Sequence, residues 1–164
     1  LDYLGGDGGG GIGAGPGLAV GAALALRGTG RLPLAVLGDG DFIMGVSALW
    51  TATHSKIPLL MVIANNRSFF NDEMHQERMA RLRGRPVENR WIGQRIDDPA
   101  IDLAAMARAQ GAIALGPVKN ARDMEPVLRD AVAKTKAGAV VVVEILVAAE
   151  YDDAIARTMV RGSE

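Results

Sequence analysis

Two polar clusters follow two strand-like apolar runs of this chain. The segment 38–41 (GDGD) follows the run 34–37, and the pair Asn65-Asn66 follows the run 59–64. Carboxylate and amide oxygens are ligands of small hard cations such as Mg²⁺, which commonly bind through substrate phosphates as well. If the two loops meet, they predict a site for a divalent cation that carries a phosphate group.

The segment between the clusters bears on whether the loops meet. Residues 43 to about 55 predict a helix, so the order is strand, loop, helix, strand, loop. A right-handed crossover of this kind makes the two strands parallel and brings both loops to the C-terminal edge of the sheet. Each cluster taken singly could be an ordinary turn or cap. Their shared edge is what favours a ligand site.

The rest of the chain also alternates between segments that predict strands and segments that predict helices. Its longest apolar run, 140–147 (VVVVEILV), is typical of a parallel strand that is buried on both faces. We therefore expect an α/β fold, doubly wound, with a mainly parallel sheet and helices on both faces. The expected strands are 32–37, 59–64, 112–115 and 140–147, and the expected helices are 17–27, 43–55, about 99–110 and 120–136.

Composition narrows the classes of function. The chain has 164 residues, enough for one domain, and its 49% hydrophobic but 4% aromatic content predicts an aliphatic core. A net charge of −1 argues against nucleic acid as the main partner. The absence of cysteine excludes disulfides and favours an intracellular, cytoplasmic setting. No apolar stretch reaches the roughly 20 residues of a membrane span. Because Leu1 replaces an initiator Met, we expect a piece of a longer protein.

The Gly-Asp-Gly and Asn-Asn clusters resemble the diphosphate-binding motif of thiamine-diphosphate-dependent enzymes. The segments 10–13 (GGIG), 47–52 (SALWTA) and 56–58 (KIP) resemble the cofactor domain of benzoylformate decarboxylases and their acetolactate-synthase-like relatives. The resemblance covers most of the chain and is loosest over 78–95 and in the tail. It implies that residues 1–150 form the thiamine-diphosphate-binding domain and that 151–164 is a partly helical tail.

The resemblance assigns a metal site. It implies that Mg²⁺ is bound by the carboxylate of Asp39, the side-chain oxygen of Asn66 and the backbone carbonyl of Ser68, and that it bridges two diphosphate oxygens.

The same motif implies which backbone groups hold the diphosphate. Gly38 opens the motif, the amides of Gly40 and Asp41 donate to the diphosphate, and the amide of Phe69 adds another donor. Asp41 stands where the family often has a small hydroxyl residue, so only its backbone role carries over.

The glycine-rich N-terminal segment acquires a role as well. In the family, an apolar residue at the position of Ile12 props the two cofactor rings into a bent shape, while the carbonyl at Gly10 and the amide at Ile12 bind the aminopyrimidine edge. A dinucleotide fingerprint over 8–13 is disfavoured because no strand precedes these glycines. A flexible leader stays an alternative.

Residues that could act on substrate are fewer. His75 lies in the polar segment just after the expected metal loop and is a candidate for proton transfer, while arginines between 78 and 95 fit a solvated face or a subunit contact.

No glutamate precedes Glu73. In the family, the glutamate that activates the cofactor sits in a separate pyrimidine-binding domain, so the resemblance implies that pyrimidine-binding and middle domains lie outside this chain. The expected partner is such a domain, in the same longer chain or in a separate subunit, within a homodimer or homotetramer. The implied activity is decarboxylation of a 2-oxo acid or acetolactate-type carboligation. The alternative is a non-catalytic cofactor-binding or assembly module.

Overall fold

The computed structural model describes residues 3–4 and 11–150 of the chain. The chain divides into two compact units. The first comprises Leu1–Asn65 and Asp102–Val147, and the second comprises Asn66–Ile101 with Ala148–Glu164. The expected C-terminal tail, 151–164, lies outside the described residues.

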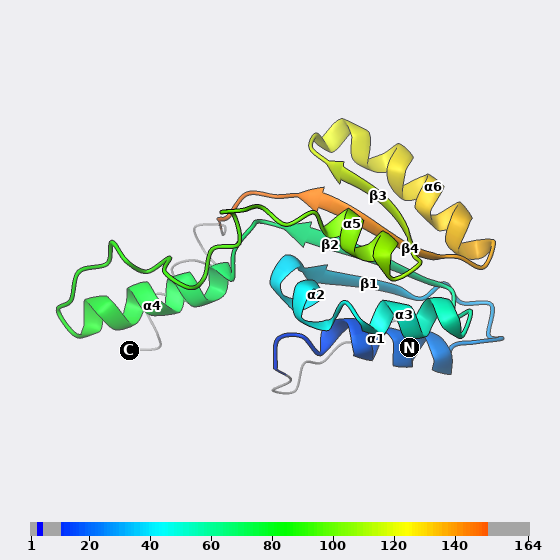
Figure 1. Ribbon diagram of the computed structural model, residues 1–164, viewed down its shortest axis with the longest axis horizontal. Helices are drawn as coiled ribbons and strands as arrows, with labels where there is room; N and C mark the ends of the chain where they lie inside the picture. Colours follow the sequence, from blue (N-terminus) through cyan, green and yellow to red (C-terminus); the bar gives the residue numbers. More distant parts are fainter. Residues whose placement is uncertain (1–2, 5–10, 151–164) are drawn as a thin grey trace. The chain divides into compact units, whose positions relative to one another are not determined.

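A four-stranded sheet forms the centre of the first unit (Figure 1). All neighbouring strands are parallel, as predicted, because helical crossovers return the chain to the same edge each time. The sheet has the order β1-β2-β4-β3, with β1 at Leu34–Gly38, β2 at Leu59–Asn65, β3 at Ile113–Val118 and β4 at Val140–Leu146.

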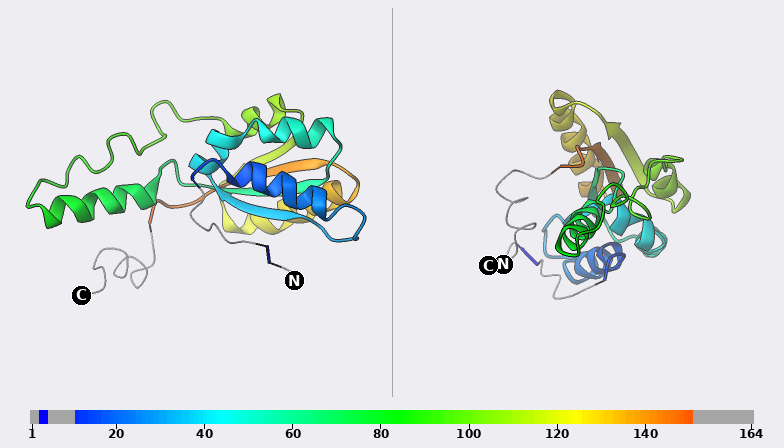
Figure 2. Two further views of the ribbon diagram at one scale, coloured as in Figure 1. Left: turned by 90° about the horizontal axis from the view of Figure 1, so that it is seen from below. Right: turned by 90° about the vertical axis from the view of Figure 1, so that its left-hand side faces the viewer.

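One face of this sheet is covered by several helices, and α1 packs beside α3 (Figure 2, left). Apolar side chains such as Phe42, Leu49 and Leu103 bury against Met61 and Ile63 of the central strand β2. The helices on this face are α1 (Gly15–Ala25), α2 (Asp39–Gly45), α3 (Ala48–His54) and α5 (Leu103–Ala109).

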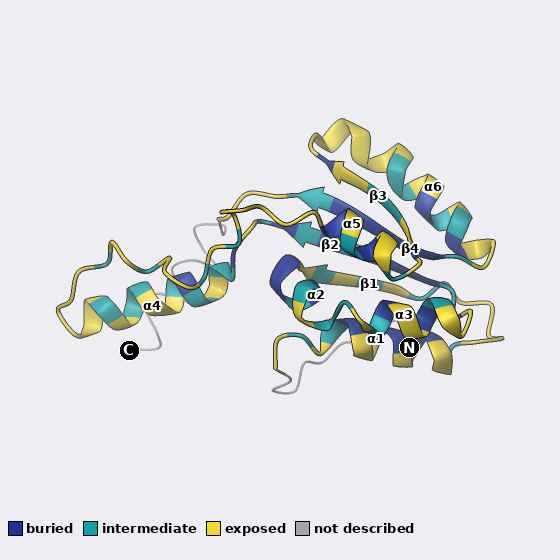
Figure 3. Ribbon diagram, viewed as in Figure 1, coloured by how far each residue is buried: buried dark blue, intermediate teal, exposed yellow. Residues whose placement is uncertain are grey.

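The opposite face is covered by α6 (Met124–Lys136), which follows a 3₁₀ turn at Ala121–Asp123. Ala131 of α6 is buried there together with Val141 and Val143 of β4. Helices therefore lie on both faces, which confirms the doubly wound α/β architecture. Figure 3 shows that the central strands β2 and β4 are mostly buried, whereas positions of the edge strand β1 alternate between exposed and half-buried.

The second unit is built on α4 (Phe70–Leu82) and the chain that returns beside it. Two backbone hydrogen bonds join the start of α4 to this return: the Phe69 amide donates to the Gln94 carbonyl at 2.9 Å, and the Ile96 amide donates to Arg67 at 2.8 Å. No helix in the described parts of the chain is long and apolar enough to cross a membrane.

The prediction of a single helix over 43–55 is wrong. The chain forms α2 and α3 with a break at Val46 and Ser47. Two hydrogen bonds of the i→i+3 type bridge the break, from Leu49 to Val46 at 3.0 Å and from Trp50 to Ser47 at 3.2 Å. A tight turn therefore replaces regular α-helical pairing at that point.

Two other helix starts differ from expectation. The helix α5 begins at Leu103 because the carboxylate of Asp102 accepts a hydrogen bond from the Ala105 amide at 2.7 Å, which is an N-cap. The helix expected to begin at 120 starts as a 3₁₀ turn, and the side chain of Asn120 forms no cap there but donates to Asp123.

Candidate functional site

The first candidate loop follows β1. Gly38, the last residue of β1, is in register with Ala64 of β2, so the residues that leave both strands start from the same edge of the sheet. Asp39 begins α2 and is only 4% exposed. One of its carboxylate oxygens, Oδ1, accepts a hydrogen bond from the Gly40 amide at 3.0 Å. A buried carboxylate thus stands where the sequence predicts it, at the carboxyl end of a parallel strand.

The backbone at Gly38 is open. Its dihedral angles are extended, and a Cβ atom added there would meet no atom of the described residues within 4 Å. Nothing in the part of the chain that the structure describes therefore requires glycine at this position. Open backbone beside a buried carboxylate fits a site that an anionic group approaches closely.

The second candidate loop follows β2. Asn65 ends this strand, is buried, and donates from its side chain to Glu144 of β4 at 2.8 Å. The residues that follow Asn65 belong to the second unit, where the Asn66 side-chain oxygen accepts a hydrogen bond from the Ser68 amide at 2.9 Å. Arg67, between them, has a left-handed backbone with φ 59°. The loop is thus a tight turn held by the side chain of Asn66.

Ser68 and Phe69 complete this loop. Ser68 is 6% exposed, and its hydroxyl donates to Glu73 at 2.5 Å. The Phe69 amide, expected as a diphosphate donor, already donates to the Gln94 carbonyl at 2.9 Å. A diphosphate contact from Phe69 would require that backbone bond to open.

Glu73 is a residue whose importance to this loop the sequence did not reveal. Its side chain is 2% exposed, accepts from Ser68 and lies 3.6 Å from Arg95 Nε. Arg95 also lies over the ring of Trp91, 6.0 Å from its centroid. These contacts run through a polar segment that has no apolar periodicity, so no sequence signal distinguished Glu73 from its charged neighbours.

The third candidate is the glycine-rich segment before α1. The Ala14 amide donates to the Gly11 carbonyl at 3.2 Å and closes a turn around Ile12 and Gly13. Gly13 has φ +100°, which the third position of a type II turn requires. Ile12 stands before it with half of its surface exposed, whereas Gly10 lies outside the described residues.

Asp41 connects this turn to the first loop. One oxygen of its carboxylate, Oδ1, accepts from the Gly13 amide at 2.5 Å and from the Gly15 amide at 3.2 Å. The sequence assigned Asp41 a backbone role alone, and this long-range side-chain contact could not be foreseen from it.

The remaining candidate, His75, is exposed on α4. Among the described residues, no three His, Cys, Asp or Glu side chains gather into a metal-binding cluster. The expected Mg²⁺ ligands do not need one, since they comprise a single carboxylate, an amide oxygen and a backbone carbonyl.

Comparison with known families identifies the domain. Residues 2–145 match the model of the thiamine pyrophosphate enzymes, specifically their C-terminal TPP-binding domain. The chain belongs to this family. Thiamine pyrophosphate is the same molecule as thiamine diphosphate, so the match confirms the resemblance drawn from the Gly-Asp-Gly and Asn-Asn motifs.

Solved structures agree with this fold. A thiamine diphosphate-dependent 4-hydroxybenzoylformate decarboxylase from Rhodococcus jostii RHA1 superposes with a TM-score of 0.63 at 26% identity, over 87% of this chain and 24% of its own. A benzoylformate decarboxylase from Polynucleobacter necessarius superposes with a TM-score of 0.65 at 23% identity, over 87% of this chain and 25% of its own. The chain thus spans about a quarter of the length of either enzyme.

Proposed function

We propose that this chain is the Mg²⁺- and thiamine-diphosphate-binding portion of a lyase or carboligase that acts on 2-oxo acids. The observation that carries the proposal is the buried carboxylate of Asp39 beside the open backbone of Gly38, at the carboxyl edge of a parallel sheet in a TPP-binding domain. Decarboxylase chemistry is favoured by the similarity, at 26% identity, to a 4-hydroxybenzoylformate decarboxylase.

We assign the metal to Asp39, the side-chain oxygen of Asn66 and the carbonyl of Ser68. This donor set is all oxygen and has one negative charge, which fits a hard cation that keeps water and phosphate oxygens as its other ligands. The side-chain oxygens of Asp39 and Asn66 each already accept a backbone amide, from Gly40 and Ser68, so both loops are held in shape by their own side chains.

We assign the diphosphate to the backbone at Gly38, Gly40 and Asp41. The Gly40 amide donates to Asp39 Oδ1 within the loop. If Asp39 bound the metal through that oxygen, the Gly40 amide would be able to donate to the diphosphate instead, so that one hydrogen bond within the loop would be exchanged for one to the ligand.

We assign Ile12 to the cofactor rings. It is an apolar residue at the tip of a turn, half exposed, and its packing contributes little to the core of the domain. Ile12→Ala should therefore leave the thermal stability of the protein unchanged while it weakens cofactor binding or slows turnover.

The chemistry of the reaction depends on the cofactor, which when bound supplies the carbanion and the electron sink for decarboxylation. This chain's residues anchor the metal and the diphosphate and support the rings. We propose that the activating glutamate comes from a pyrimidine-binding domain of the same longer protein or of another subunit. His75, exposed on α4, is the candidate of this chain for proton transfer to substrate.

Calorimetry on the longest natural chain that contains this sequence tests the cofactor site. Asp39→Ala and Asn66→Ala should each weaken binding of Mg²⁺–thiamine diphosphate at least about 100-fold, because even outer-shell partners of a metal contribute about 10–100-fold. Asp130→Ala is the matched control, since Asp130 pairs with Lys134 on the surface of α6. Unchanged affinity in both site variants would refute the assignment.

The alternative, a cofactor-binding or assembly module without activity, predicts the same calorimetry but a different product analysis. A panel of 2-oxo acids should give aldehydes or hydroxyketones if the protein is a lyase or carboligase. Tight cofactor binding without any product from the panel would favour the module.

A further inference from the structure

The helix α1 begins without a cap of its own. Its N-cap residue is Ala14, which has no side-chain acceptor, and its first turn contains no acidic residue. Pro16 in that turn has no amide hydrogen to donate. The amide of Gly15 and the positive end of the helix dipole therefore need a partner from elsewhere in the fold.

Asp41 of α2 is that partner. Its Oδ1 accepts from Gly13 at 2.5 Å and from Gly15 at 3.2 Å, across 28 and 26 positions of sequence. A carboxylate at a helix N-terminus is stabilised by the dipole and by charge-assisted hydrogen bonds. The Asp41 carboxylate thus interacts with the N-terminus of α1, although Asp41 lies only two residues from Asp39.

The glycines of the loop allow this contact because their backbone lies directly on α2. A Cβ added to Gly15 would stand 1.8 Å from Asp41 Oδ2, and one added to Gly45 would stand 2.4 Å from the Gly13 carbonyl oxygen. At Gly13 a Cβ would lie 2.9 Å from that of Met44. Side chains at these positions would force the loop away from α2, so the glycines give a specific close packing rather than flexibility.

We propose that Asp41 is a positioning residue that ties the turn carrying Ile12 to the helix that begins at Asp39. The contact holds the loop assigned to the cofactor rings at a fixed place relative to the loop assigned to the diphosphate. The effect of this contact on cofactor binding rests on the proposed function, whereas the contact itself does not. Asp41 replaces the small hydroxyl residue expected from the family resemblance, and its carboxylate makes the contact that holds the two loops together.

Hydrogen–deuterium exchange of the cofactor-free, full-length protein tests the tie itself. Asp41→Leu, which keeps the branch at Cγ but has no acceptor, should speed exchange in the peptide 11–18 by about tenfold or more, the equivalent of one lost charge-assisted hydrogen bond. Asp41→Asn retains an acceptor oxygen and should restore most of the protection. If exchange in Asp41→Leu equals that of the natural protein, the proposal is refuted.

Gly15→Ala disturbs the same contact from the other side. Its Cβ would displace the Asp41 carboxylate, so exchange should speed up as in Asp41→Leu. Gly17→Ala is the matched control in the same helix, because a Cβ at Gly17 meets no described atom within 4 Å. It should not speed exchange, and as a better helix former it should slow exchange slightly, with no loss of cofactor affinity. Equal behaviour of the two alanine variants would contradict the proposed packing.

Cofactor affinity then separates positioning from simple stabilisation. Calorimetry well below the unfolding temperature should show about tenfold weaker binding of Mg²⁺–thiamine diphosphate by Asp41→Leu, with recovery in Asp41→Asn. Unchanged affinity in a folded Asp41→Leu variant would overturn the positioning role. If the natural protein itself binds no cofactor, the proposed function fails, whereas the exchange experiment still decides whether the tie exists.

Discussion

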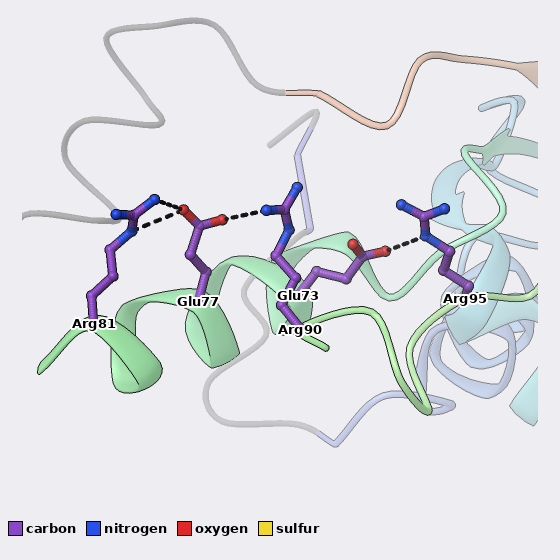
Figure 4. Close-up of polar contacts among 5 residues, drawn as sticks. All are labelled: Glu73, Glu77, Arg81, Arg90 and Arg95. Carbon is purple, nitrogen blue, oxygen red and sulfur yellow. Dashed lines mark hydrogen bonds and ion pairs between the residues drawn. The ribbon is translucent and has the colours of Figure 1, made fainter. Parts of the chain in front are cut away.

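Replacing Glu73 by alanine should loosen the loop that carries Ser68. Glu73 is 2% exposed, and its carboxylate accepts a hydrogen bond from the Ser68 hydroxyl. The same carboxylate pairs with Arg95 (Figure 4). Loss of an acceptor for a buried hydroxyl costs about 1–3 kcal/mol. The 3.6 Å pair with Arg95, which is 48% exposed, adds about 0.2–1 kcal/mol after solvent screening. One buried methylene adds about 0.8 kcal/mol.

These contributions sum to about 2–5 kcal/mol of local stability, which corresponds to an acceleration of amide exchange of about 30-fold to 3,000-fold. The measurement is hydrogen–deuterium exchange of the peptide 66–76 in the full-length protein without cofactor. Glu73→Gln keeps an acceptor oxygen of the same shape, so its exchange should stay within about fivefold of the natural protein.

Glu77→Ala is the matched control on the same helix. Glu77 pairs with Arg81 at 2.7 Å and with Arg90 at 3.0 Å, but those arginine side chains are 59% and 38% exposed. Exposed pairs contribute about 0.2–1 kcal/mol each, so loss of both should cost about 0.4–2 kcal/mol and speed exchange about twofold to 30-fold. If Glu77→Ala has as large an effect as Glu73→Ala, the reasoning from burial and from the Ser68 hydrogen bond is refuted.

Three further predictions concern the stability of the first unit, measured by chemical or thermal unfolding. Asn65→Leu should cost about 1–3 kcal/mol, because buried Glu144 loses the donor that lies 2.8 Å away, and an unchanged midpoint would contradict this role. Gly116→Ala should cost about 2 kcal/mol or more, since Gly116 has φ +108° and its Cβ would lie 2.4 Å from the Glu144 carbonyl oxygen. Gly21→Ala, its control in open space on α1, should instead stabilise the protein by about 0.5–1 kcal/mol. Met61→Ala should cost about 2–5 kcal/mol, as its side chain is fully buried in the centre of the sheet, and a loss below about 1 kcal/mol would show that the core collapses around the gap.

The strands could be predicted because buried parallel strands leave a direct trace in the sequence. The runs that became β2 and β4 are almost wholly apolar, since both of their faces are covered. The loops at the carboxyl ends of β1 and β2 followed from the handedness of the crossover, which left few arrangements for Asp39 and Asn65.

The helix α4 could not be predicted in the same way. Its residues are polar on most sides and provide no apolar stripe, while Glu77 and Glu73 contact arginines as much as 22 positions away. The break between α2 and α3 was also missed. Gly45, just before the break, lies against the Gly13 carbonyl, which is a contact of tertiary structure and has no local signal.

By itself, the sequence determined that this chain folds as a doubly wound α/β domain of the thiamine pyrophosphate enzyme family, and it named the loops that we assign to metal and diphosphate. Local patterns suffice for this because apolar runs, turn residues and short motifs are read along the chain. The tertiary structure alone decided that Glu73 supports Ser68 and that Asp41 ties the glycine loop to α2. Polar side chains are stable in water as well as in buried, hydrogen-bonded positions. The sequence pattern therefore does not indicate which of them are buried and what they bind.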